Sequence, residues 1–353
     1  MKFSICIPNY NYEAYLGRTI QSVLAQTYSD FEIVVSDNAS TDKSVQVVQS
    51  FSDPRITLRV NACNIGFAGN LDRAARMATG DYLILLSSDD LLLPTALATY
   101  SQILERVGAD QNCVLSAAVN VVDAEDRECG RLGFPEYVWD GSPRALDLEP
   151  IAGGEVCVLP ARELLRRCLQ AMKNPFHFAS TAYPRKLYER VEGYGGGRLM
   201  NPDKWFHWKL LAIADRAFFI DRPMAAYRWH SSNQNAIQAG SGALKYLIDE
   251  YASTFEFDRK VLADLNFPLE DLQRAFIERD IVRGAAVALA KGQRGLAQRT
   301  IRFGQAAYPA WTRWNWKLWA LQTLTCLGPV GSWFARLGYA RHRRVVRNLF
   351  EEI

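Results

Sequence analysis

Short apolar runs alternate with amphipathic stretches along the first 120 residues. The apolar runs are rich in β-branched residues and predict strands at 3–7, 31–36, 56–60, 82–86 and 114–122. Between them, apolar residues recur at helical spacing and predict helices at about 13–26, 42–51, 66–79 and 94–107. This alternation predicts an α/β domain whose mainly parallel sheet has helices on both faces.

The pattern changes after residue 122. Residues 123–155 are rich in Gly, Pro and Asp and predict a long irregular loop, of the kind that often covers a site. The elements expected next are a helix from near Pro160, a strand at 176–183, a helix at 202–214 and a strand at 217–229. From about residue 243 the pattern is almost wholly helical, so we predict a domain boundary after residue 235.

Charge is distributed unevenly over this pattern. The chain has 41 Lys and Arg against 38 Asp and Glu, a formal net charge of +3. Residues 281–350 hold 12 of the basic residues and no acidic residue, which leaves the rest of the chain acidic. A basic segment on an acidic body indicates a polyanionic partner surface, either anionic lipid or nucleic acid.

The cysteines and the start of the chain indicate a cytoplasmic protein. The seven cysteines are scattered and none forms a Cys-x-x-Cys pair, so we expect reduced thiols rather than a disulfide framework or a zinc site. The first residues run straight into a strand pattern, so no signal peptide is expected.

Polar residues end two of the predicted strands, at the edge where parallel sheets bind ligands. Asp37 and Asn38 end the strand at 31–36, and their oxygens can accept hydrogen bonds from a base or a ribose. An Asx turn that caps the next helix is the simpler interpretation of this pair.

An acidic pair, Asp89 and Asp90, ends the strand at 82–86 directly after Ser88. Adjacent carboxylates repel each other, and their burial is costly unless a cation neutralises them. Carboxylate oxygens suit Mg²⁺ or Mn²⁺, which in turn bind a diphosphate. Solvated acids in a strand-to-helix loop are an equally good interpretation.

Two further residues become candidates only in combination with these. His230 follows the strand at 217–229, where a lone histidine is more often a satisfied core or surface residue than a ligand. Asp203 opens the predicted helix at 202–214, where an acid usually interacts with the helix dipole.

Together these features resemble the family 2 inverting glycosyltransferases of the GT-A fold. The stretch 4–11, Ser-Ile-Cys-Ile-Pro-Asn-Tyr-Asn, looks like the family's N-terminal signature, and motifs in 26–32 and 64–82 continue it in order. The resemblance covers roughly residues 1–235 and implies a GT-A catalytic domain with a mixed, Rossmann-like sheet. Within it, 1–120 would bind the nucleotide sugar and 121–235 the acceptor, and a helical extension would follow at 236–353.

The resemblance also implies roles for single residues. Tyr10 would stack on the base, and the residues expected around the nucleotide are Pro8, Tyr10, Asp37, Asn38, Asn64, Asn70 and Ser88. Asp89 would bridge Mn²⁺ or Mg²⁺ to both phosphates. His230, with Asn233 in a His-x-x-Asn element, would lie near the diphosphate and contact the metal. Asp203 would act as general base after a Gly-rich turn at 193–197.

The chain departs from the family pattern at three positions. Ser87 stands where the metal motif usually has its first Asp, which leaves fewer carboxylates for the metal. Asn38 stands where some members carry a second Asp that faces the base, so a uridine donor is favoured on less than the full pattern. Pro202 replaces the usual Glu before the base, which removes one acceptor contact.

Five of the nine tryptophans lie between residues 311 and 333, and a cluster of arginines at 341–347 follows them. Gly328, Pro329 and Gly331 interrupt the uncharged stretch, so we expect a helix pair lying in the membrane interface rather than crossing the bilayer. A helical subdomain that packs its tryptophans against the catalytic domain is the alternative.

The predicted function is transfer of a sugar from a nucleotide diphosphate donor, with UDP-sugar favoured, to a glycan or polyprenyl-linked acceptor in surface polysaccharide synthesis. The enzyme would be cytoplasmic and peripheral at the inner face of the membrane. Nucleic acid is not expected as a partner, because it would not explain the acidic pair. The alternatives are a sugar-1-phosphate nucleotidyltransferase, which needs a Gly-rich loop after the first strand, and a non-catalytic nucleotide-sugar-binding scaffold.

Overall fold

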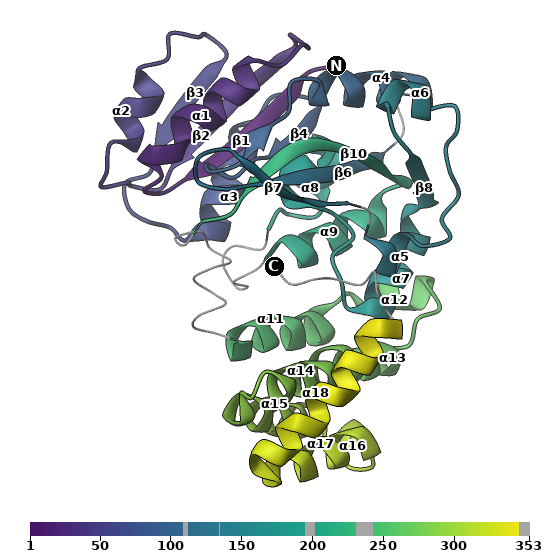
Figure 1. Ribbon diagram of the computed structural model, residues 1–353. Coiled ribbons are helices and arrows are strands. Elements are labelled where there is room, and N and C mark those ends of the chain that lie inside the picture. The colour runs from purple at the N-terminus through teal and green to yellow at the C-terminus, as the bar shows by residue number, and fades with distance from the viewer. Residues whose placement is uncertain (109–111, 134, 195–201, 231–242, 346–353) are drawn as a thin grey trace. The chain divides into compact units, whose positions relative to one another are not determined.

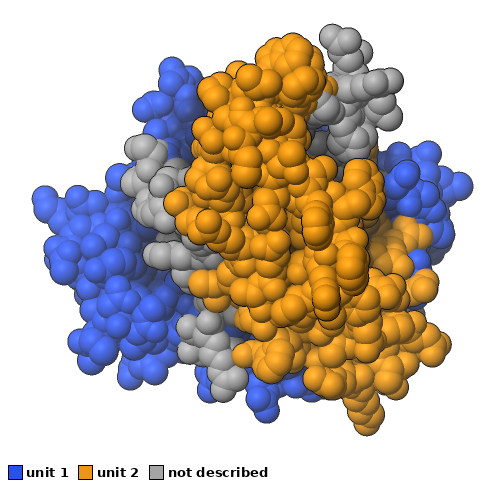
Figure 2. Space-filling model, turned by 90° about the horizontal axis from the view of Figure 1, so that it is seen from below, with its two compact units in different colours: residues 1–135, 139–165, 174–236 blue, residues 136–138, 166–173, 237–353 orange. Residues whose placement is uncertain are grey.

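The chain folds into two compact units, which are coloured separately in Figure 2. The sheet unit comprises residues 1–135, 139–165 and 174–236, and the helical unit comprises 136–138, 166–173 and 237–353. The computed structural model describes residues 1–108, 112–133, 135–194, 202–230 and 243–345. The predicted separation of nucleotide-binding and acceptor-binding parts within 1–235 stays a prediction.

A mixed ten-stranded sheet forms the centre of the sheet unit (Figure 1). Its order is β3-β2-β1-β4-β9-β6-β10-β5, with β7 beside β6 and β8 beside β10. The strands are β1 (Phe3–Asn9), β2 (Phe31–Asp37), β3 (Ile56–Val60), β4 (Tyr82–Leu85), β5 (Leu91–Leu92), β6 (Cys113–Val122), β7 (Glu128–Leu132), β8 (Val156–Pro160), β9 (Ala182–Pro184) and β10 (Arg216–Arg228). Strands β3, β2, β1 and β4 run parallel, whereas β9 pairs antiparallel with both β4 and β6. The predicted α/β architecture with a mixed sheet is confirmed.

Helices connect these strands, and the four predicted within the first 120 residues are present. The helices of the sheet unit and its borders are α1 (Glu13–Leu24), α2 (Ser44–Gln49), α3 (Phe67–Met77), α4 (Ala96–Val107), α5 (Glu136–Trp139), α6 (Glu149–Ala152), α7 (Ala161–Ala171), α8 (Arg185–Arg190) and α9 (Pro202–Ile213). Fully buried residues of β1, including Phe3, Ile5 and Ile7, pack in one core with Leu16 and Ile20 of α1. Burial of such apolar side chains is the main stabilising term of the unit.

Two predictions about the middle of the chain were wrong. The expected irregular loop at 123–155 contains β7, α5 and α6, because β7 folds back on β6 and pairs with it. The expected strand at 176–183 is mostly a 3₁₀ turn (Phe178–Ser180), and only its end joins the short β9. There the Ser180 hydroxyl donates to the carbonyl of Ala117 at 2.6 Å and the Thr181 hydroxyl to that of His177 at 2.6 Å. These side-chain bonds compete with a regular strand ladder.

The helical unit confirms the prediction of an almost wholly helical C-terminal region. Its helices are α11 (Ala243–Glu256), α12 (Arg259–Asp264), α13 (Leu269–Phe276), α14 (Arg283–Ala290), α15 (Arg294–Ala307), α16 (Pro309–Thr312), α17 (Trp316–Cys326) and α18 (Gly328–Val345), and a π-helical turn (Ile277–Val282) joins α13 to α14. Buried Leu272, Phe276, Ile281 and Leu289 lie in its interior. Among the described residues, none of the helices has the length and apolar character needed to cross a bilayer.

Candidate functional site

The carboxyl ends of β1 and β2 carry the first predicted cluster. The two strands are in parallel register, with Asn9 opposite Asp37. The buried Asp37 carboxylate accepts hydrogen bonds from the Asn9 amide at 2.8 Å and from the backbone N–H and hydroxyl of Ser40 at 2.9 and 2.6 Å. Asp37 thus fixes the loop that follows β2, which is the Asx-turn geometry expected as its simpler interpretation.

Three asparagines, Asn38, Asn64 and Asn70, lie beside Asp37, and we call these four residues the amide cluster. The Asn38 amide donates to the side-chain oxygen of Asn64 at 2.8 Å, and its own oxygen accepts from the backbone N–H of Ile65 at 2.9 Å. Asn70 of α3 donates to the carbonyls of Asn9 and Ser36 at 3.2 and 2.9 Å. The structure therefore brings Asp37, Asn38, Asn64 and Asn70 together, and these bonds give Asn38 and Asn70 a structural part in shaping the loops.

The remaining residues expected around the nucleotide differ in exposure. Tyr10 is 43% exposed beside the amide cluster, so its ring is accessible for stacking. Pro8 is buried within β1, and Ser88 is buried just before the acidic pair. The contact of each of these side chains with a nucleotide stays a prediction.

The second cluster joins residues that lie 141 positions apart. The two-residue strand β5 directly follows the acidic pair and pairs antiparallel with β10, with Leu92 opposite Ala225 and Leu91 opposite Ala226. If this register is continued, Asp90 and Asp89 lie alongside the end of β10. His230, just beyond β10, approaches Asp89 so that its Nε2 lies 3.0 Å from Asp89 Oδ2. The predicted metal residues therefore converge on one point.

Arg228, which the sequence analysis did not identify, fixes the positions of Asp89 and Asp90. Its side chain is fully buried, and its Nε donates to the backbone carbonyl of Asp89 at 2.7 Å. Its backbone N–H donates to Asp90 Oδ1 at 3.0 Å, and its guanidinium forms an ion pair with Asp126. Arg18 pairs with the other oxygen of Asp126 at 2.6 Å. A cation at the end of an apolar strand was the available signal for this role, since buried charges need partners.

Helix α1 fixes the acidic loop from its other side. Thr19 donates to the carbonyl of Ser88 at 2.9 Å, and the Ser22 hydroxyl accepts from the N–H of Leu92 at 3.0 Å. The Gln26 amide donates to the carbonyl of Leu93 at 2.8 Å. Gln26 belongs to the family-like motif at 26–32, so this part of the signature positions the acidic loop.

The electrostatics of this cluster favour a bound cation. Asp90 is 2% exposed, and its burial, together with the charge of Asp89, raises its pKa well above the usual range. Burial and the charges of Asp89 and Asp90 likewise raise the pKa of Tyr12. The His230 ring packs against Tyr15 with centroids 4.6 Å apart, which limits its movement.

The donor set also fits a hard divalent cation. Within the described ranges, His, Cys, Asp and Glu side chains do not form a ligating group of three or more. Asp89 and His230 would supply one carboxylate oxygen and one imidazole nitrogen. Mg²⁺ and Mn²⁺ commonly take one or two carboxylates and complete their shell with substrate phosphates and water. A site with only these two protein ligands is compatible with Ser87 in place of the usual Asp. Asn233, the other member of the His-x-x-Asn element, lies outside the described residues.

Asp203 belongs to a third cluster, at the start of α9. Its Oδ2 accepts from the Asn174 amide at 3.1 Å, and the oxygen of that amide lies 2.8 Å from His207 Nδ1. Burial lowers the pKa of His207 to about 3, so the ring is neutral and its Nδ1 is the donor to Asn174. This bond orients the Asn174 amide toward Asp203. Burial raises the pKa of Asp203, against the lowering effect of the Lys204 N–H and Asn174.

The turn before α9 is held from α3. Asp72 Oδ1 accepts from the Tyr188 hydroxyl and from the Tyr194 N–H, both at 2.8 Å. Gly193 between them has φ +70°, and a Cβ there would clash with the Asp72 carboxylate. Residues 195–197 of the predicted Gly-rich turn lie outside the described residues.

Other motif residues lie at the opposite, amino-terminal edge of the sheet. The Glu32 carboxylate accepts from Ser4 and from the N–H of Thr79, both at 2.6 Å, and from Lys2 at 2.7 Å. Although burial opposes it, these bonds lower the pKa of Glu32 to about 2. A Cβ at Gly80 would clash with the Lys2 carbonyl and the Ser4 hydroxyl. The motifs around Glu32 and Gly80 therefore serve the fold and lie away from the acidic pair.

Comparison with known proteins gives a family match in the N-terminal part of the chain and a fold match over most of it. Residues 4–149 match the family model for Glycosyl transferase family 2. An uncharacterised glycosyltransferase of Nostoc sp. is 28% identical over 252 residues, which cover 68% of this chain and 69% of that relative. The Escherichia coli UDP-Glc:α-D-GlcNAc-diphosphoundecaprenol β-1,3-glucosyltransferase WfgD is 39% identical over 27% of this chain and 37% of its own length. The structure of S. aureus TarS 1–349 with UDP-GlcNAc has a TM-score of 0.56 at 18% identity and covers 89% of this chain and 91% of that chain.

The family match spans the amide cluster and the acidic pair and ends before Asp203. Beyond it, the likeness to TarS shows that the fold extends over most of the chain. A sugar-1-phosphate nucleotidyltransferase is therefore the wrong interpretation of the α/β pattern. The chain is therefore a glycosyltransferase with the GT-A fold, and its residues 4–149 belong to Glycosyl transferase family 2.

Proposed function

We propose that the chain is an inverting glycosyltransferase that moves a sugar from a UDP-sugar to a lipid-linked glycan acceptor in polysaccharide synthesis. The observation that carries the proposal is the pair formed by Asp89 and His230 at 3.0 Å, next to the buried Asp90. Two Escherichia coli relatives are named for UDP-Glc as donor and a GlcNAc-diphosphoundecaprenol acceptor, and TarS was crystallised with UDP-GlcNAc. These names support the donor and acceptor classes proposed here.

In this proposal the amide cluster receives the nucleoside. Tyr10 stacks on the base, since it directly follows Asn9 of β1 and its ring is 43% exposed. Asp37 and Asn64 meet the base and the ribose with the lone pairs left after their protein contacts. Asn38 and Asn70 act mainly by holding these side chains in place.

Asp89 and His230 would hold Mn²⁺ or Mg²⁺ beside the diphosphate of the donor. When bound, the metal supplies Lewis-acid stabilisation of the charge on the leaving nucleoside diphosphate. Arg228 keeps the Asp89 carbonyl and the Asp90 carboxyl in register through its Nε and backbone N–H. It is a positioning residue in this scheme, since these contacts are to the protein.

Asp203 is the proposed general base. It accepts the proton of the acceptor hydroxyl, whose oxygen forms the new bond to the anomeric carbon as the bond from that carbon to the phosphate oxygen breaks. The nucleoside diphosphate leaves with the bonding electron pair, and attack from the opposite side inverts the anomeric centre. A raised pKa suits this role because it brings the basicity of Asp203 closer to working pH.

Donor turnover tests the proposal directly. The full chain is incubated with Mn²⁺ and UDP-, GDP- or dTDP-sugars, with and without a membrane lipid extract, and release of nucleoside diphosphate is measured. We expect metal-dependent release from a UDP-sugar, stimulation by the lipid extract, and a loss of roughly a thousandfold in Asp89→Asn. Asp53→Asn, in a surface loop where Asp53 pairs with Arg55, is the matched control and should turn over normally. Full activity in Asp89→Asn, or release from GDP-sugars alone, would contradict the assignment.

A further inference from the structure

Exposed aromatic side chains gather on the last helices of the helical unit. Trp314, Trp316, Trp319 and Trp333 are 79%, 73%, 61% and 56% exposed. Tryptophan is highly buried on average in folded proteins, so four such residues in one short segment require a reason. Within the part of the chain that the structure describes, these four side chains are not buried inside the helical unit. The alternative expectation, that the tryptophans pack against the catalytic domain, stays a prediction.

The apolar side chains form a stripe on each of two adjacent helices. On α17, Trp316 and Trp319 are exposed, whereas Leu318, Leu321 and Thr325 are buried. On α18, the exposed residues at spacings of three and four are Val330, Trp333, Phe334 and Leu337. Helices α17 and α18 lie side by side (Figure 1). A stripe that spans several helical turns and points to solvent is a surface without its partner.

Two glycines build this helix pair. Gly328 has φ +65° and turns the chain between α17 and α18. A Cβ at Gly331 would overlap the carbonyl of Leu324, so only glycine allows the two helices to approach this closely. The glycines that interrupted the apolar stretch in the sequence thus create a compact helical hairpin.

The charged residues of the hairpin itself are all basic. Residues 281–350 contain no acidic residue and 12 basic residues. Exposed Arg299 and Arg302 lie on α15, and Arg313 stacks over the Trp314 ring at 5.3 Å. Lys317 is paired with Glu278 at 2.6 Å. Tryptophan beside Arg and Lys is the composition that favours the interface of a bilayer with anionic lipid.

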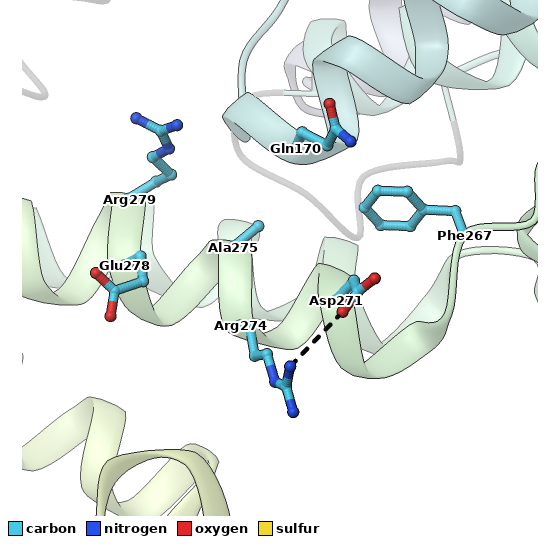
Figure 3. Close-up of a pocket in the computed structure, with 7 residues that line it drawn as sticks. All are labelled: Gln170, Phe267, Asp271, Arg274, Ala275, Glu278 and Arg279. Carbon is cyan, nitrogen blue, oxygen red and sulfur yellow. Dashed lines mark ion pairs between the residues drawn. The ribbon is translucent and has the colours of Figure 1, made fainter. Parts of the chain in front are cut away.

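Two hollows of the helical unit border this region. A groove of about 440 Å³ is lined by Trp311, Trp314 and Trp316 together with the charged residues Arg274, Glu278 and Lys317. A second hollow of about 300 Å³, shown in Figure 3, shares Arg274 and Glu278 with it and is otherwise lined mainly by Gln170, Phe267, Asp271 and Arg279. In Figure 3 Arg274 is paired with Asp271. The second hollow has Phe267 as its one large apolar side chain, so it does not extend the surface. The first adds tryptophan and basic groups to it.

We propose that the aromatic face, formed by Trp314, Trp316, Trp319, Val330, Trp333 and Phe334, docks on the surface of a bilayer that contains anionic phospholipid. The apolar side chains enter the interface between headgroups and acyl chains, and the surrounding arginines attract the phosphates. Pairing of the face with a second copy would bring two basic surfaces together, which like-charge repulsion disfavours. The inference goes beyond the proposed reaction, and it gives a lipid-linked acceptor a place to meet the enzyme.

Vesicle binding of the full chain tests this inference. The protein is sedimented with vesicles of phosphatidylcholine alone or of phosphatidylcholine with phosphatidylglycerol, at low and high salt. We expect binding to the anionic vesicles that weakens as salt rises, because salt screens surface charge. The double variant Trp316→Ser, Trp319→Ser should bind roughly tenfold more weakly or worse. Phe255→Ser is the matched control, since Phe255 of α11 is equally exposed and lies outside the aromatic face.

The outcomes separate this inference from the proposed reaction. Asp89→Asn should bind vesicles like the wild type, so a failure of the catalytic assignment leaves the binding result intact. The inference falls if the wild type stays in the supernatant with anionic vesicles, or if the double variant and Phe255→Ser bind equally well. Light scattering identifies the competing occupant: a wild-type dimer that the double variant converts to a monomer, without vesicle binding by either, would assign the face to a subunit interface.

Discussion

The two edges of the parallel strands β1 and β4 carry polar clusters that look alike in sequence and behave oppositely in the structure. At the amino-terminal edge, hydrogen bonds to Glu32 outweigh the effect of burial and hold its pKa near 2. At the carboxyl-terminal edge, burial and like charge raise the pKa of Asp90. One cluster is satisfied by the protein itself, whereas the other holds excess negative charge that a ligand can relieve.

The difference indicates that Glu32 and its neighbours stabilise the fold, whereas Asp89 and Asp90 serve ligand binding. Loss of Glu32 at the amino-terminal edge of the sheet should cost stability and leave turnover almost unchanged. Loss of a buried carboxylate charge at Asp90 or Asp203 should cost turnover and leave stability unchanged or higher, whereas loss of the buried Arg228 should cost both. The three following variants test that division, starting with the largest expected effect.

Asp203→Asn should lower kcat by about a thousandfold, because a general base typically contributes between a hundredfold and ten-thousandfold. Burial raises the pKa of Asp203 in the folded protein, so its ionised carboxylate costs stability at pH values above its unfolded pKa. Removal of the charge should therefore raise the free energy of unfolding at neutral pH. Turnover and thermal unfolding measured on the same preparation check both statements.

The general-base role of Asp203 would be contradicted by the following outcome. Near wild-type kcat with unchanged donor affinity would leave Asp203 as a helix-capping acid. His207→Gln is a useful companion, since His207 holds the Asn174 amide that bonds Asp203. It should lower kcat less than Asp203→Asn and leave the KM for the donor unchanged.

Arg228→Gln should weaken metal-dependent activity by roughly ten- to a hundredfold, the usual effect of losing a group that orients a metal ligand. Gln cannot reach Asp126 and the Asp89 carbonyl together, so the acidic loop loses its connection to the turn after β6. The apparent affinity for Mn²⁺ in the turnover assay is the measurement. Arg18→Gln removes the other partner of Asp126 and serves as control, with an effect of a few-fold at most. Equal effects of the two variants would show that only the fold of the turn matters.

The sequence predicted the regular part of this site well. The helices between the strands have periodic patterns because each buries one face. Strands β1, β2 and β4 read as short apolar runs because nearly all of their residues are buried. The periodic pattern alone therefore placed Asp37 and Asp89 at the carboxyl ends of their strands and at one edge of the sheet. Once the strand ends are known from the pattern, the edge of the sheet at which each polar residue lies is known as well.

The contacts that the sequence could not predict depend on short or irregular elements. Asp89 meets His230 through β5, a strand of two residues that is too short to leave a pattern. Asn174 lies in an irregular stretch between α7 and a 3₁₀ turn, so nothing in its local sequence points to Asp203. Arg228 was visible as a charge at the end of an apolar strand, but its partners came from two separate loops, the acidic loop and the turn after β6. Such long-range polar contacts are determined by packing rather than by local preference.

Glu32→Gln should have the smallest effect on turnover and a clear effect on stability. The pKa of Glu32 falls from its usual value of 4.5 to about 2 in the folded protein, and each unit is worth about 1.4 kcal/mol, so the variant should lose about 2 kcal/mol at neutral pH. The value is set below the full shift because the partner Lys2 is partly exposed and its ion pair is screened by solvent. Urea unfolding gives the free energy, and donor turnover at low temperature should stay within about twofold of the wild type.

The pH dependence of that difference identifies its origin. A carboxylate with a lowered folded-state pKa stabilises the fold above its unfolded pKa of 4.5, and this stabilisation is lost as pH falls through about 2. The gap in unfolding free energy between the wild type and Glu32→Gln should therefore be constant above about pH 5 and shrink as Glu32 takes up its proton. Glu270→Gln, at an exposed carboxylate of α13 in the helical unit, shows whether any surface carboxylate would give the same curve. A gap that persists unchanged at low pH would mean that packing around Thr79 and Gly80, and not the charge of Glu32, holds this edge of the sheet.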